Sequence, residues 1–153
     1  AYKELGELIS AFRLKIDERG FQTALVETAD EFRRRCNLEI ECQNSLPPTL
    51  LSANEEIHIL RIIREALANI EKHANATAVK INASLSIADQ VVVTVVDNGI
   101  GIGDKKSPDN HYGLIIMEDR ARSLGGTVEI ADGDSKGTVV TVTFTPEKSL
   151  IDT

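Results

Sequence analysis

The chain has 153 residues, of which 42% are hydrophobic and 27% charged, and this length and composition predict a single globular domain. The net charge of −7 argues against nucleic acid as a partner, because such a surface needs a dense basic patch. No stretch approaches the roughly 18 consecutive apolar residues that cross a membrane. Cys36 and Cys42 have no partners at metal-ligand spacing, so we expect them to be reduced, packed thiols.

Two helices and a strand are predicted in the first part of the chain. Residues 2–19 carry one apolar stripe at helical spacing, which Gly20 interrupts. A second helix is expected over 22–35, and residues 38–42 alternate with period two, as a strand does. Pro47-Pro48 then separates this part from the rest of the chain.

The longest helix is predicted over 54–74, with Ser52 or Asn54 as its cap. Residues 77–85 and 90–96 read as two strands of a hairpin.

A polar stretch with several glycines comes next, and then a helix from about Gly113 to Leu124, which Gly125-Gly126 would end. Strands over 127–131 and 138–144 complete the chain. This order of elements predicts a two-layer α/β sandwich, a mixed and mostly antiparallel sheet with helices on one face.

The long helix carries polar residues on the side away from its apolar face. Glu65, Asn69, Lys72 and His73 lie at i, i+4, i+7 and i+8. An amide oxygen can ligate Mg²⁺, a lysine can bind phosphate, and a glutamate can polarise a nucleophile. The alternative is an ordinary solvent-exposed helix face.

An acidic residue succeeded by alternating glycines ends the strand over 90–96. The carboxylate of Asp97 can only accept hydrogen bonds, so it suits an amine such as that of adenine, and Gly99 and Gly101 permit close approach of a ligand. The acid precedes the glycines and no Gly-Lys-Ser/Thr comes after them, which excludes the dinucleotide fingerprint and the P-loop. A plain turn is the alternative.

Two weaker signals lie further along the chain. A helix beginning at Gly113 would leave backbone N–H groups free for phosphates, and the Thr138 hydroxyl could share a water or a hydrogen bond with Asp97. The alternatives are a helix start and a hairpin turn.

Taken in order, these segments resemble the boxes of the Bergerat-fold ATPases, in the version carried by the NarL-partner subfamily of sensor histidine kinases. The matching segments are 64–74 (the N box), 97–101 and 113–121 (the two glycine boxes) and Gly137-Thr138. Residues 111–121, together with Phe12 to Leu14, look most like nitrate/nitrite sensor kinases of the NarX/NarQ type.

The resemblance implies a role for each of these positions. Asn69 would hold Mg²⁺ against the triphosphate of ATP, with Lys72 and His73 near the phosphates, and Glu65 corresponds to the catalytic acid of the family's ATPases. Asp97 would bind the adenine amine. The other residues expected to contact ATP are Gly99, Gly101, Gly113, Leu114, Met117 and Thr138, with 101–113 as the lid.

The resemblance also implies how the chain is organised. Residues 1–20 would end a dimerisation hairpin, 21–148 would form the ATP-binding domain, and 149–153 would be a tail. None of the three histidines, His58, His73 and His111, is followed by an acid as the phosphoacceptor would be. We therefore expect an excised, monomeric fragment that binds ATP but cannot phosphorylate itself.

The parent protein is expected to be a homodimeric bacterial inner-membrane sensor kinase with this domain in the cytoplasm. Its acceptor histidine would receive the γ-phosphoryl and pass it to an aspartate of a NarL-type response regulator. Two alternatives stay open: a non-catalytic nucleotide-binding module, and a serine kinase of the anti-sigma type on the same fold.

Overall fold

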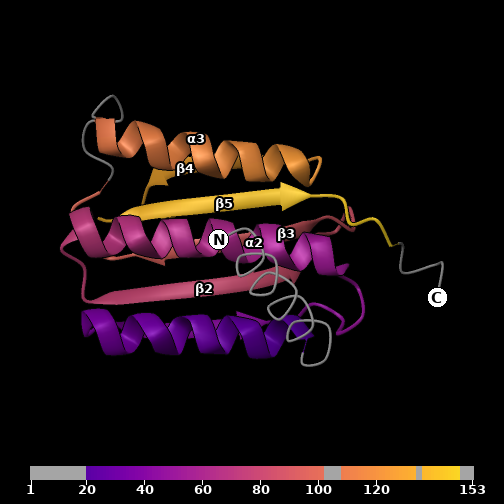
Figure 1. Cartoon of the computed structure of the whole chain (residues 1–153), viewed down its shortest axis with the longest axis horizontal. Coiled ribbons are helices and arrows are strands. Elements are labelled where there is room, and N and C mark those ends of the chain that lie inside the picture. The colour runs from indigo at the N-terminus through magenta and orange to yellow at the C-terminus, as the bar shows by residue number, and fades with distance from the viewer. Residues whose placement is uncertain (1–19, 102–107, 134–135, 149–153) are drawn as a thin grey trace, which may run out of the picture.

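The computed structural model describes residues 20–101, 108–133 and 136–148 in two layers. Figure 1 shows three helices lying side by side over one face of a sheet: a helix over 20–36, α2 (Ala53–Asn69) and α3 (Pro108–Ser123). The predicted helix over 2–19, and with it the hairpin segment, lies outside the described residues, as does the tail.

The sheet has five strands in the order β1-β2-β3-β5-β4. β1 pairs with β2 in parallel, whereas the pairs β2–β3, β3–β5 and β4–β5 are antiparallel. The predicted mixed, mostly antiparallel α/β sandwich is therefore confirmed. The strands are β1 (Glu39–Asn44), β2 (Ala78–Leu85), β3 (Val91–Asp97), β4 (Thr127–Asp132) and β5 (Thr138–Phe144).

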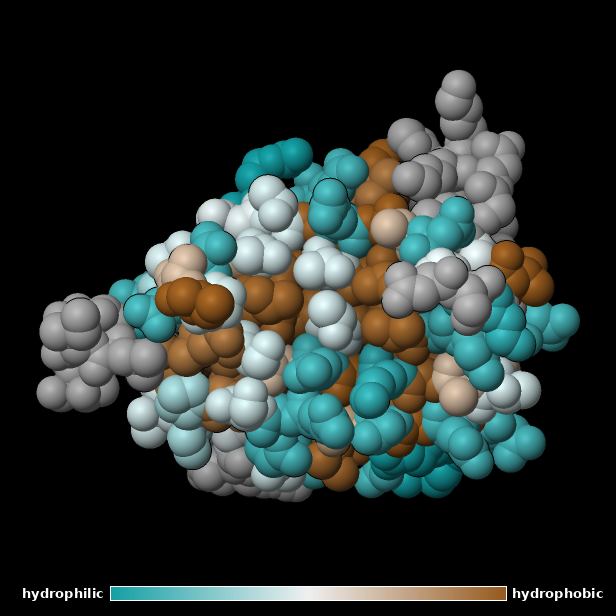
Figure 2. Space-filling view, turned by 180° about the vertical axis from the view of Figure 1, so that it is seen from behind, coloured by the Kyte–Doolittle hydropathy of each residue, from teal (hydrophilic) through white to brown (hydrophobic). Residues whose placement is uncertain are grey.

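The core lies between the sheet and the helices. Along β3 the residues alternate strictly, with Val91, Val93 and Val95 buried against the helices. Figure 2 shows the opposite face of the sheet, which none of the described helices covers and where valine and threonine side chains of the central strands are half-exposed. None of the helices among the described residues is both long and apolar enough to span a bilayer.

Helix α2 begins with a capping box. The Ser52 hydroxyl accepts from the Glu55 backbone N–H at 3.1 Å, and the Glu55 carboxylate accepts from the Ser52 N–H at 2.9 Å. At its other end α2 continues as a π-helix, η1 (Ile70–Ala74), which Asn75 ends in the left-handed conformation with φ of 53°. The predicted helix over 54–74 thus exists, but its last turn is not α-helical.

Helix α3 starts earlier than predicted. It begins at Pro108, a residue favoured in the first helical turn because it lacks an N–H that would be unsatisfied there. The expectation of a helix N-terminus at Gly113 is therefore wrong, because Gly113 lies five residues inside α3. The predicted end is confirmed: Gly125 has φ of +71°, and its N–H donates to the carbonyl of Arg122.

Candidate functional site

A buried carboxylate lies at the end of the central strand β3. Asp97 is only 5% exposed, and its Oδ1 accepts a hydrogen bond from the Gly99 N–H at 2.8 Å. Burial raises the pKa of Asp97, while hydrogen bonds from the backbone of Gly99 and Thr138 act in the opposite direction. Thr138 therefore contacts Asp97 through its backbone N–H. The role expected of its hydroxyl stays a prediction.

Two glycines allow the loops at this edge of the sheet to approach closely. Gly137 has φ of +85°, and a Cβ there would lie 1.9 Å from the backbone oxygen of Asp97. Gly101 has φ of +94°, and a Cβ there would lie 3.0 Å from Oδ1 of Asp132. Glycine at 137 is thus required by its contact with the backbone as well as by its conformation, whereas at 101 the positive φ is the main reason for glycine.

Asn98, for which the sequence predicted no role, anchors the end of β3 beside Asp97. Its Oδ1 accepts from the backbone N–H groups of Thr77 and Ala78 at 2.9 and 3.0 Å, and its Nδ2 donates to the Thr77 hydroxyl at 2.9 Å. These bonds fix the end of β3 to the start of β2, so Asp97 is held at a defined position.

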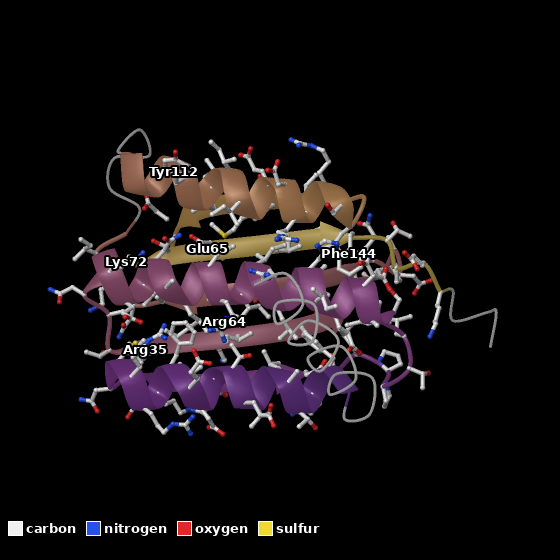
Figure 3. All side chains as sticks on the ribbon, in the orientation of Figure 1. Arg35, Arg64, Glu65, Lys72, Tyr112 and Phe144 are labelled. Atoms are coloured by element: carbon white, nitrogen blue, oxygen red, sulfur yellow. The ribbon has the colours of Figure 1, made fainter. Side chains whose placement is uncertain are left out.

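A second group of site residues meets where α2 faces α3. A Cβ on Gly113 would lie 3.2 Å from both Oδ1 of Asn69 and Oε1 of Glu65, and 2.9 Å from Nδ2 of Asn69. Figure 3 shows Glu65 on the side of α2 that is turned toward α3. The two predicted catalytic residues therefore share one place, and Gly113 packs directly against them.

This pair of side chains suits a hard divalent cation. Asn69 and Glu65 present an amide oxygen and a carboxylate oxygen to the same space, and Mg²⁺ prefers oxygen ligands while retaining several waters. Both residues are half-buried, so neither belongs to a fully solvated helix face.

Among the described residues, the structure does not bring the remaining predicted site residues together with Glu65 and Asn69. Lys72 is exposed in η1, where the π-helical turn departs from the spacing of the predicted stripe, and the His73 side chain lies outside the described ones. Met117 is 1% exposed and belongs to the hydrophobic core, whereas Leu114 is half-buried. Most of the expected lid, 102–107, lies outside the described residues.

Comparisons with known proteins bear on this geometry. Residues 54–148 match the family model described as histidine kinase-, DNA gyrase B-, and HSP90-like ATPase. The chain belongs to this ATPase family. The matched segment, residues 54–148, contains the elements that carry the candidate site residues: α2, β3, α3 and β5. The helix over 20–36 and β1 come before this segment.

Among curated proteins, the chain is 40% identical over 152 residues to the nitrate/nitrite sensor protein NarX of Escherichia coli K12, covering 99% of this chain. It is 38% identical over 144 residues to NarQ of the same strain, covering 94% of this chain. The chain spans a quarter of the length of each of these relatives.

Solved structures share the fold of this ATPase domain. The blue-light activated histidine kinase of Erythrobacter litoralis has a TM-score of 0.66 at 20% identity, covering 78% of this chain and 40% of that protein. Full-length ShkA in complex with AMPPNP also has a TM-score of 0.66, at 21% identity, covering 82% of this chain and 30% of that protein.

Proposed function

We propose that this chain binds Mg-ATP, with the adenine at Asp97 and the phosphates between α2 and α3. The observation that carries the proposal is the buried Asp97 carboxylate. A buried charge is costly unless it is used or neutralised, and this one is held by backbone N–H donors from Gly99 and Thr138. A carboxylate fixed in this way can accept a hydrogen bond from the N6 amine of adenine.

Nucleotide selectivity tests this assignment. Guanine carries a carbonyl oxygen where adenine carries the N6 amine, so two acceptors would face each other at Asp97. Calorimetric titration should therefore show that Mg-GTP binds at least about tenfold more weakly than Mg-ATP. Equal affinities for the two nucleotides would contradict the role of Asp97 in binding adenine.

At the phosphate end, Asn69 and Glu65 are the residues that would hold Mg²⁺ or its waters. The metal would neutralise charge on the phosphate oxygens. Glu65 lies beside Asn69, where it would orient the metal's water shell or the nucleophile. The Lys72 ammonium would add a positive charge near the phosphates.

In the full-length protein, we propose that ATP donates its γ-phosphoryl group to a histidine on the dimerisation helix of the same homodimer. The bond between the γ-phosphorus and the bridging oxygen breaks, a nitrogen–phosphorus bond forms on the imidazole, and ADP leaves. The group would then pass to an aspartate of a NarL-type response regulator. The identities of 40% and 38% to NarX and NarQ support the proposed phosphoryl transfer. They also support two further proposals: that the full-length protein senses nitrate or nitrite, and that this domain is the cytoplasmic part of an inner-membrane protein.

The outer side of α3 offers a surface for the acceptor helix. Tyr112 is 72% exposed, and Ile115 and Ile116 are about 40% exposed, at 39% and 41%. These three residues lie at i, i+3 and i+4, so they form one apolar side of the helix. Gly113, in the same turn, packs on Asn69 and Glu65, so an acceptor bound on this side would lie close to the phosphate end.

Phosphoryl transfer can be tested by adding the dimerisation domain of the full-length protein to this chain in trans. The wild-type chain should label that domain from γ-labelled ATP, and Asn69→Ala should abolish labelling. The phosphohistidine should be lost in acid, whereas a phosphoserine survives it. An acid-stable label would favour the serine-kinase alternative, and full labelling by Asn69→Ala would refute the metal-binding role.

A further inference from the structure

The helix over 20–36 is fastened to α2 beside the catalytic residues. The Glu31 carboxylate forms a two-bond salt bridge with Arg64, with Oε1 3.1 Å from Nη1 and Oε2 2.8 Å from Nη2. Such a forked pair fixes direction as well as distance. Arg64 directly precedes Glu65, so this contact acts on the turn of α2 that carries the candidate catalytic acid.

A second contact reaches the π-helical turn. Oε2 of Glu71, in η1, accepts from Nε of Arg35 and from the Cys36 thiol, each at 3.0 Å. Arg35 also approaches Glu31 at 3.4 Å, so the two contacts belong to one network. Glu71 lies two residues after Asn69, the proposed metal ligand.

Both arginines rest on one buried ring. The guanidinium carbon of Arg35 lies 4.3 Å from the centroid of the Phe32 ring and that of Arg64 lies 5.6 Å from it, and Phe32 is only 1% exposed. Figure 3 shows Arg35 and Arg64 between the helix over 20–36 and α2, whereas Glu65 lies on the α3 side of α2. The ring gives the network a rigid base.

The spacing of the two contacts gives them a common effect. Arg64 and Glu71 are seven residues apart, about two helical turns, and both are tied to the same neighbouring helix. Two ion pairs on the side of α2 that faces the helix over 20–36 oppose rotation of α2 about its own axis. Such rotation would turn Asn69 away from the proposed phosphate site. The π-helical turn is a local departure from the regular α-helix, and the contact with Arg35 holds it at Glu71.

We propose that Arg64 and Glu71 are positioning residues for the Mg-triphosphate, which act by tying α2 and η1 to the helix over 20–36. This inference rests on the proposed function, because it takes Asn69 to be the metal ligand. The helix over 20–36 lies outside the family-wide match of residues 54–148, so the network joins the shared ATPase core to a segment beyond it.

Two ligands separate a positioning role from a merely structural one. Mg-ATP needs both ends of the site, whereas adenosine without metal needs only the Asp97 end. In calorimetric titrations of the 153-residue chain, Glu71→Gln and Arg64→Gln should each weaken Mg-ATP binding about two- to fivefold, the size expected for exposed ion pairs. Adenosine affinity should be unchanged.

A charge swap and a control complete the experiment. The double variant Arg35→Glu with Glu71→Arg should recover part of the Mg-ATP affinity that Glu71→Arg alone loses, because the introduced glutamate pairs with the new arginine but also lies beside Glu31. Arg122→Gln removes an exposed ion pair to Asp119 within α3 and should leave both affinities unchanged.

The outcomes are distinct. If wild type binds Mg-ATP and the variants bind it equally well, or lose adenosine to the same extent, the positioning role is refuted while ATP binding stands. If wild type does not bind Mg-ATP at all, the proposed function fails, and this inference fails with it.

Discussion

Replacing Gly113 by alanine would test the contact between α3 and the side of α2 that carries Glu65 and Asn69. The new methyl group would lie 2.9 Å from Nδ2 of Asn69 and 3.2 Å from Oδ1 of Asn69 and from Oε1 of Glu65. Carbon atoms without a hydrogen bond to their neighbours prefer separations of about 3.5–4.0 Å. The end of the Asn69 side chain must therefore move by roughly 0.5 Å, and the Glu65 carboxylate by a few tenths of an ångström.

This movement should affect binding more than folding. The clashing atoms are ends of flexible side chains, and alanine inside a helix gains up to about 1 kcal/mol over glycine, so the free energy of unfolding should change by less than about 1 kcal/mol. Mg²⁺ demands near-ideal geometry, so displacement of Asn69 should remove most of its contact with the metal. A lost charge-assisted interaction of about 1.5–3 kcal/mol weakens Mg-ATP binding at least about tenfold.

The assays are calorimetric titration with Mg-ATP and with adenosine, together with urea unfolding. Adenosine binding should persist, because Asp97 is not contacted by the new methyl group. A Gly113→Ala protein that binds Mg-ATP with wild-type affinity would refute the argument. So would one that loses adenosine and stability in proportion, since that result would mean general disruption of the fold.

Three further changes have outcomes that the structure predicts. Gly137→Ala should destabilise the fold by about 3 kcal/mol or more in urea unfolding, because its Cβ would lie 1.9 Å from the backbone oxygen of Asp97 at φ of +85°; near-wild-type stability would contradict the close approach. Ser52→Ala should cost about 1 kcal/mol by loss of the capping box with Glu55, and an unchanged unfolding midpoint would argue against it. Burial raises the pKa of Asp97, so the native state binds this proton more tightly than the unfolded state does, and stability falls as pH rises from the ordinary aspartate pKa of about 3.9 through the native value. Asp97→Asn should accordingly resist urea better than wild type at about pH 7, with a difference that shrinks near about pH 3; a difference independent of pH would refute the cause given.

Local sequence patterns predict the elements well where a single period governs them. Alternation in β3, the cap Ser52 and the stop at Gly125 all reflect interactions between residues close in the chain, and the structure confirms each of them. The start of α3 is different, because a glycine after a polar loop resembles a helix start. The small size of Gly113 instead serves packing against Asn69, which lies 44 residues earlier in the chain.

The sequence predicts the composition of the site but not its contacts. A regular α-helical spacing places Lys72 in line with Asn69, and no local signal reveals the π-helical turn that changes its direction. The ties between Glu31 and Arg64 and between Arg35 and Glu71 join residues more than 30 positions apart. Charged residues on helix surfaces are common, so only the three-dimensional structure distinguishes these pairs from solvated side chains.

Calorimetric titration of Mg-ATP into wild type, Asp97→Asn and the control Asp89→Asn tests the central claim most directly. Asp89 lies in an exposed hairpin turn with φ of 59°, a conformation that asparagine tolerates. Wild type and Asp89→Asn should bind Mg-ATP equally, and Asp97→Asn should not bind it measurably, because an amide offers adenine a mismatched donor and no charge. Equal binding by Asp97→Asn would show that this carboxylate does not hold adenine and would overturn the assignment of the site.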